Sequence, residues 1–176
     1  YIGKKFTTGI TYLVADYDTQ EILAGKNVDT VRPLASFTKV MTAYRLMSEG
    51  LSLNYSSTYD EGEHKSAYHR FRIANGEKYL NSDLLKSMLV SSLNTPARIL
   101  VDSVADNEAD FISRMNKQAK DWGLVETAFT DVYGYDLGNI STAREYLILY
   151  LKAEKNKTAR DYLGMENYEY DELLDK

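Results

Sequence analysis

The 176-residue chain contains no cysteine and only two histidines. Without cysteine it can form no disulfide, no thiolate zinc site and no thiol nucleophile. His64 and His69 are five residues apart, a spacing that does not place both on one helix face, so we predict that both are surface residues. We therefore expect no metal site. With only two histidines, the chain also has few residues that could serve as the base of a Ser-His catalytic pair.

Long apolar runs and excess positive charge are also missing. The apolar runs, such as Tyr12–Ala15, are far shorter than a membrane-spanning helix. A net charge of −5 and a pI near 5.1 argue against a nucleic-acid partner.

The length suits a single domain spanning residues 1–176. Because the chain starts at Tyr1 with neither an initiator Met nor a signal segment, we interpret it as processed or trimmed.

The order of elements predicts a mixed fold. Strand formers in 9–16 and 21–27 flank a turn at 17–20, which predicts a β-hairpin. Helical spacing follows downstream. The expected helices run over 37–49, ending at Gly50; over 84–90, capped by Asn81 or Ser82; from Pro96 onward; over 111–122, ending at Gly123; and over 143–150, opened by a capping box of Thr142 and Glu145.

The segment Ser36-Phe37-Thr38-Lys39 lies where a loop gives way to a helix. Residues i and i+3 share a helix face, so the hydroxyl of Ser36 and the amine of Lys39 can meet. A neutral amine can accept the serine proton, provided that desolvation or a nearby cation lowers the pKa of Lys39. The alternative is structural: Ser36 caps the helix and Lys39 is a solvated charge.

A second candidate element is Ser92-Leu93-Asn94, 56 residues after Ser36. Ser92 and Asn94 could present a hydroxyl and an amide to the same cleft. The alternative is that Asn94 or Thr95 simply caps the helix that begins at Pro96.

Together these segments resemble the penicillin-recognising serine acyl-enzymes, whose motifs are S-x-x-K, S-x-N and K-T-G. The resemblance is closest to the low-molecular-weight D-Ala-D-Ala carboxypeptidases, and it covers most of residues 9–152. It is carried by the hairpin at 17–24, the nucleophile segment at 32–43, the approach to the second motif at 75–94, and the stretches 111–124, 134 and 139–145.

The resemblance implies an α/β fold of the α+β type, like that of β-lactamases and transpeptidases. In it an antiparallel sheet carries the N-terminal hairpin, helices pack on the sheet, and a helical insert lies between the motifs. It implies that Ser36 is the acylated nucleophile and Lys39 its general base. Ser92 would relay the proton to the leaving D-alanine, Asn94 would hydrogen-bond the substrate peptide, and the N–H of Ser36 would be one oxyanion donor. The Ser-Lys pair implies no cofactor.

The sequence departs from the family at the third motif. In the family, K-T-G follows the second motif by about a hundred residues on a strand beside the cleft. This chain ends 82 residues after Asn94, and its nearest match, Lys157-Thr158-Ala159, lies in a segment with helical rather than strand composition. We expect the C-terminal strands of the sheet to be missing because of truncation, with a partner chain or a degenerate relative as the alternatives.

The implied function is a serine-type D-Ala-D-Ala carboxypeptidase that acts on peptidoglycan stem peptides outside the cytoplasmic membrane. Such an enzyme is covalently inhibited by β-lactams and could use an anchor outside this chain. Two alternatives remain. One is a module that binds muropeptide or β-lactam without turnover. The other is a β-lactamase, which is disfavoured because the Glu-x-x-Leu-Asn element for fast deacylation does not occur.

Overall fold

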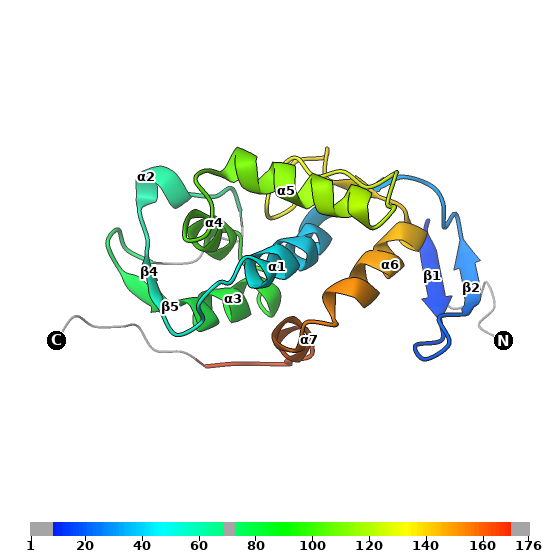
Figure 1. The fold of residues 1–176 in the computed structure, drawn as a ribbon, viewed down its shortest axis with the longest axis horizontal. Coiled ribbons are helices and arrows are strands. Elements are labelled where there is room, and N and C mark those ends of the chain that lie inside the picture. Colours follow the sequence, from blue (N-terminus) through cyan, green and yellow to red (C-terminus); the bar gives the residue numbers. More distant parts are fainter. Residues whose placement is uncertain (1–8, 69–72, 170–176) are drawn as a thin grey trace.

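The computed structural model describes residues 9–68 and 73–169 (Figure 1). Its elements, in chain order, are β1 (Tyr12–Ala15), β2 (Ile22–Lys26), β3 (Arg32–Pro33), the 3₁₀ helix η1 (Ala35–Phe37), α1 (Thr38–Ser48), β4 (Ser56–Thr58), α2 (Glu61–His64), β5 (Lys78–Leu80), α3 (Asn81–Leu89), α4 (Thr95–Asp102), α5 (Glu108–Asp121), β6 (Ile140–Ser141), α6 (Ala143–Ala153) and α7 (Lys157–Leu163). The α+β class expected from the sequence is confirmed.

The predicted hairpin forms between β1 and β2, which pair antiparallel with Tyr12 opposite Lys26. Its turn is stabilised by Asp16, whose carboxylate accepts the backbone N–H of Thr19 at 2.8 Å. The strands are shorter than predicted. The other strands form two more antiparallel pairs, β3 with β6 and β4 with β5.

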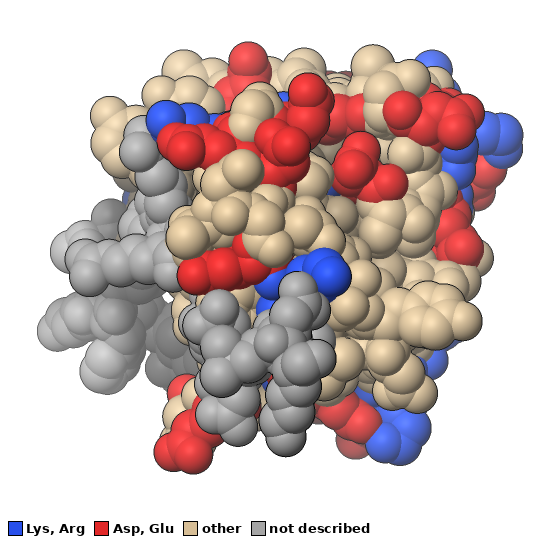
Figure 2. Space-filling model, turned by 90° about the vertical axis from the view of Figure 1, so that its left-hand side faces the viewer, with Lys and Arg blue, Asp and Glu red and all other residues tan. Residues whose placement is uncertain are grey.

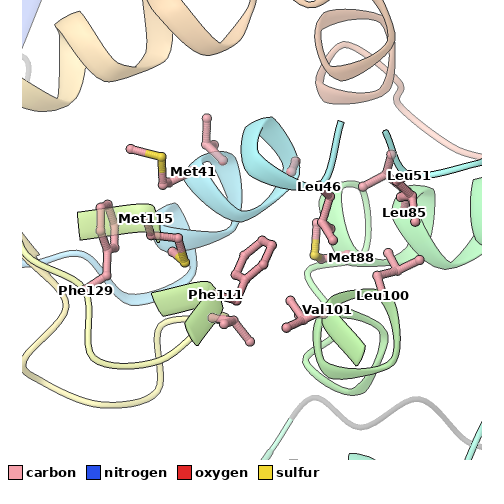
Figure 3. Close-up of a cluster of buried hydrophobic side chains, with 14 of the residues drawn as sticks. Met41, Leu46, Leu51, Leu85, Met88, Leu100, Val101, Phe111, Met115 and Phe129 are labelled. Carbon is pink, nitrogen blue, oxygen red and sulfur yellow. The ribbon is translucent and has the colours of Figure 1, made fainter. Parts of the chain in front are cut away.

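Helix α1 is the centre of the fold. It contacts α3, α4, α5, α6 and α7, and Figure 1 shows it between α5 and α3. Its apolar residues repeat at helical spacing, and Met41 and Leu46 are fully buried. They belong to a core that also receives Met88 from α3, Val101 from α4 and Phe111 from α5 (Figure 3). This packing fixes the axis of α1, and therefore the position of its first turn.

Short strands hold the segment before α1. β3 pairs with β6 in the register Arg32–Ser141 and Pro33–Ile140. One residue later, the N–H of Leu34 donates to the carbonyl of Asn139 at 2.8 Å. The chain therefore enters η1 from a position fixed by a segment more than a hundred residues downstream.

Helix ends follow the predictions in part. Gly50 and Gly123 have positive φ angles, +83° and +76°, and follow α1 and α5 as expected. The cap predicted at Asn81 or Ser82 is wrong: Leu80 is the N-cap residue, and the Asn81 amide instead contacts Ser57 and Ser52. Half of the capping box is present. Thr142 accepts the N–H of Glu145, but the Glu145 carboxylate accepts from Glu126 and Thr127.

The prediction that His64 lies on the surface is wrong. The residue is only 5% exposed, because the short helix α2 packs against α4. Its Nδ1 accepts the N–H of Asp60 at 2.9 Å, which holds the ring against the start of its own helix. His69 lies outside the described residues.

The end of the molecule near α2, β4 and β5 carries scattered acidic side chains with basic side chains among them (Figure 2).

Within residues 9–68 and 73–169, no helix is both long and apolar enough to cross a bilayer.

Candidate active site

Ser36 lies in η1, directly before the first turn of α1, and it is exposed to solvent. The preceding residue, Ala35, has a φ of +49°, a left-handed conformation that non-glycine residues adopt at a cost. The N-terminus of a helix carries a partial positive charge, which favours an anion at this position. The backbone therefore presents the Ser36 hydroxyl at the positive end of α1.

Lys39 is buried, with 2% of its surface exposed, and its amine contacts three oxygen atoms. Nζ lies 3.0 Å from Oγ of Ser36, 3.4 Å from Oγ of Ser92 and 2.7 Å from Oδ1 of Asn94. The structure therefore brings together all four residues predicted as the site. Ser36 and Lys39 come from one helix start, and Ser92 and Asn94 come from the segment between α3 and α4.

The amide of Asn94 is oriented by its surroundings. Nδ2 donates to the carbonyl oxygens of Ala67 at 2.8 Å and Tyr68 at 3.2 Å. These oxygens can only accept, so Oδ1 must face Lys39. A neutral amine has two N–H groups and one lone pair. With one N–H directed to Asn94 and the other toward Ser92, the lone pair can accept the hydroxyl proton of Ser36.

Burial lowers the pKa of Lys39 from its ordinary value of 10.5 to about 8, while the nearby Asp131 carboxylate opposes part of this change. At pH 7 a pKa of about 8 leaves roughly one amine in ten neutral, compared with a few in ten thousand at the ordinary value. The burial of this lysine therefore supplies the desolvation that a neutral lysine base requires.

The loop after α5 packs against the backbone at Ser36. The carboxylate of Asp131 accepts the N–H groups of Tyr133 at 2.8 Å and Asp136 at 2.6 Å, and it also accepts that of Gly134. The hydroxyl of Thr42 in α1 donates to the carbonyl of Val132 at 2.7 Å. These bonds press Gly134, with a φ of +87°, onto the peptide bond between Ala35 and Ser36.

A cavity of about 930 Å³ opens beside Ser36. It lies between the hairpin strand β1, the helices α3 and α6, and the end of α7. Most of its lining is apolar. The hydroxyl of Tyr146, from α6, donates to the carbonyl of Phe37 at 3.2 Å, and burial raises the pKa of this phenol. Ser36 therefore lies at the edge of an open, largely apolar cavity.

The structural alternative for Ser36 and Lys39 is wrong: Leu34 and Phe37 are the N-cap residues of η1 and α1, and Lys39 is buried. Asn94 is the N-cap residue of α4, but its side chain makes no capping bond and contacts Lys39 instead. Lys157 and Thr158 begin helix α7, as their composition predicted, rather than a strand. The roles of Ser92 in proton relay and Asn94 in substrate binding stay predictions.

Sequence reasoning missed two groups that shape the site. The carbonyls of Ala67 and Tyr68 orient Asn94, but any residue offers a carbonyl, so no sequence signal exists. Asp131 organises the loop that contacts Ser36. The run Asp131, Gly134, Asp136 could have indicated a tight turn, because Asp side chains accept nearby backbone N–H groups.

Comparison with known proteins finds a matching family and several similar sequences. The sequence model of the D-alanyl-D-alanine carboxypeptidases matches residues 6–172. The chain is 30% identical over 146 residues to a D-alanyl-D-alanine endopeptidase of Escherichia coli, covering 81% of this chain and 46% of that protein. It is 31% identical over 149 residues to D-alanyl-D-alanine carboxypeptidase DacC of Escherichia coli, covering 78% of this chain and 37% of that protein.

Solved structures agree with the sequence matches. The D-alanyl-D-alanine carboxypeptidase DacD from Francisella tularensis superposes with a TM-score of 0.81 at 25% identity, covering 89% of this chain and 40% of that one. The chain spans less than half the length of these relatives.

Proposed function

Because the chain belongs to the D-alanyl-D-alanine carboxypeptidase family, we propose that it carries the nucleophile half of a serine DD-peptidase active site. Its substrate would be a peptidoglycan stem peptide, from which the terminal D-alanine is removed. The observation that carries this proposal is the cluster in which one buried amine contacts Ser36, Ser92 and Asn94.

Acylation starts at Ser36. Its Oγ forms a bond to the carbonyl carbon of the penultimate D-alanine while its proton passes to the lone pair of Lys39. The oxyanion that forms is stabilised by the N–H of Ser36 at the positive end of α1. The bond between carbon and the leaving nitrogen then breaks. The proton moves from Lys39 through the hydroxyl of Ser92 to that nitrogen, and D-alanine leaves.

Deacylation reverses the proton path. A water molecule adds to the ester carbonyl and gives its proton to Lys39. The bond between the carbonyl carbon and Oγ breaks, and Oγ of Ser36 recovers the proton. Asn94 holds the amine in place throughout. These steps use the side chains of Ser36, Lys39 and Ser92, with Ser36 N–H as an oxyanion donor.

The wider setting is part of the same proposal. Residues 1–176 would form one domain, and the single hydrophobic core of the described residues supports this. The protein would act outside the cytoplasmic membrane, where peptidoglycan lies, and β-lactams would inhibit it covalently. The carboxylate of the substrate would be bound by a K-T-G strand, a motif that this sequence does not contain.

Mass spectrometry with benzylpenicillin tests the proposal. We expect one molecule to add to Ser36, and we expect Ser36→Ala to abolish the addition. Absence of any adduct on the wild-type chain would contradict acylation chemistry. Reversible binding without an adduct would favour a module that binds muropeptide or β-lactam without turnover.

A further inference from the structure

Two exposed tyrosines from distant segments stack beside the site. Tyr68 is 69% exposed and Tyr135 is 54% exposed, and their ring centroids lie 5.7 Å apart with an interplanar angle of 31°. Tyr133 packs behind them, with its ring centroid 6.5 Å from that of Tyr135. The two rings therefore present apolar faces to solvent, on which a bound group could stack.

Both rings are attached to the catalytic cluster through the backbone. The carbonyl of Tyr68 accepts from Asn94, whose Oδ1 contacts Lys39. Tyr135 follows Gly134, which packs on the Ala35–Ser36 peptide. Tyr68 is therefore linked to Lys39 through Asn94. Tyr135 is next in sequence to the glycine that packs against Ser36.

The backbone holds Tyr68 in an unfavourable conformation. Its φ is +48°, which is uncommon for a bulky residue and persists only where surrounding contacts over-determine it. The Asn94 amide fixes the carbonyls of Ala67 and Tyr68. These bonds hold the Tyr68 ring against Tyr135.

We propose that Tyr68 and Tyr135 form a binding subsite for an apolar acyl substituent on the carbonyl side of the scissile bond. This inference rests on the proposed acyl transfer at Ser36. An extended chain advances about 3.3 Å per residue. Asn94 contacts both Lys39 and the carbonyl of Tyr68, so we expect a group one or two residues before the acylated carbonyl to extend along Asn94 toward the rings. The flat faces of the two tyrosines suit an aromatic or aliphatic group, which stacks on them without needing a charge.

The test compares two β-lactams that share one bicyclic core. Benzylpenicillin carries a phenylacetyl group on its side-chain nitrogen, and 6-aminopenicillanic acid lacks it. Acylation of Ser36 is followed by mass spectrometry. We expect Tyr68→Ala and Tyr135→Ala to reduce the benzylpenicillin rate about 3- to 10-fold, the scale of one lost aromatic contact, while the rate with 6-aminopenicillanic acid changes less than about 2-fold. Tyr68→Phe should keep the wild-type ratio.

Tyr55→Ala is the matched control, since Tyr55 is 73% exposed and precedes β4, outside the site. A ratio that stays at the wild-type value in both alanine variants would overturn the subsite. An equal fall with both compounds would also overturn it, because the rings would then support the fold of the site rather than bind the substituent.

A second measurement separates this inference from the proposed chemistry. In the Ser36→Ala variant, the ring signals of Tyr68 and Tyr135 are followed by NMR during titration with phenylacetyl-D-alanyl-D-alanine and with acetyl-D-alanyl-D-alanine. Shifts caused by the phenylacetyl compound, with the Tyr55 signal unmoved, support the subsite even if no β-lactam acylates the wild type. Equal responses to the two peptides would reject it.

Discussion

Replacing Gly134 with alanine measures how tightly the loop that contains Asp131 packs against the Ala35–Ser36 peptide. An ideal Cβ on Gly134 would lie 1.8 Å from the carbonyl oxygen of Ala35 and 3.0 Å from the nitrogen of Ser36. Because the contacted atoms are backbone, no side-chain rotation can relieve the clash. The φ of +87° adds the cost of a left-handed alanine.

Gly76 separates these two contributions. It has nearly the same φ, +88°, but an added Cβ would meet nothing within 4 Å. We expect Gly76→Ala to lower the free energy of unfolding by about 1–2 kcal/mol, the conformational cost alone. Gly134→Ala should lose a further ~1–3 kcal/mol or more from overpacking. If the loop and η1 move apart instead, a displacement of Ser36 by about 1 Å should slow acylation roughly 100-fold.

Urea denaturation followed by circular dichroism gives the stability difference, and mass spectrometry with benzylpenicillin gives the acylation rate. The two variants should differ in at least one of these measurements. Equal stability losses together with wild-type acylation in Gly134→Ala would refute the close contact between Gly134 and the Ala35–Ser36 peptide.

Three more predictions concern the proton path. Lys39→Arg should abolish β-lactam labelling while leaving a cooperative melt, because a guanidinium cannot be deprotonated, and unchanged labelling would exclude Lys39 as the base. In the wild type, only the neutral amine accepts the Ser36 proton, so the acylation rate should rise with pH and level off above about 8, and a flat profile between pH 6 and 9 would contradict this. Ser92→Ala should slow acylation by roughly 10²–10⁴-fold in stopped-flow or mass measurements, whereas a wild-type rate would leave Ser92 a purely structural residue.

How much the sequence could predict depends on the range of each interaction. Ser36 and Lys39 are three residues apart at a helix start, so local geometry alone brings them together. The approach of Ser92 and Asn94 to Lys39 needs the packing of α3 and α4 on α1, and the sequence indicated it only through the family resemblance. The length of the hairpin strands and the burial of His64 depend on tertiary contacts as well.

Backbone conformation at the site was beyond sequence reasoning. Ala35, Tyr68 and Ser92 all have positive φ angles, of +49°, +48° and +55°. None of them is a residue type that favours positive φ, so the sequence did not indicate these backbone conformations. The surrounding hydrogen bonds impose these conformations, and those bonds form only once the core is assembled.

The buried amine of Lys39 also affects how firmly the protein folds. The pKa of Lys39 is about 8 in the folded state and near 10.5 when the chain unfolds. Below pH 8 the amine is mostly charged in both states, so folding must bury a charge, and this lowers the stability of the protein. The difference of about 2.5 pKa units corresponds to roughly 3 kcal/mol of lost stability at neutral pH, because each unit is 1.36 kcal/mol. Between pH 8 and 10.5 the unfolded chain binds more protons at this group than the folded chain, so this contribution to stability should rise with pH. Subtracting the unfolding free energies of Lys39→Met from those of the wild type across that range would isolate the effect. The amine that we propose as the base for Ser36 therefore also lowers the stability of the fold at neutral pH.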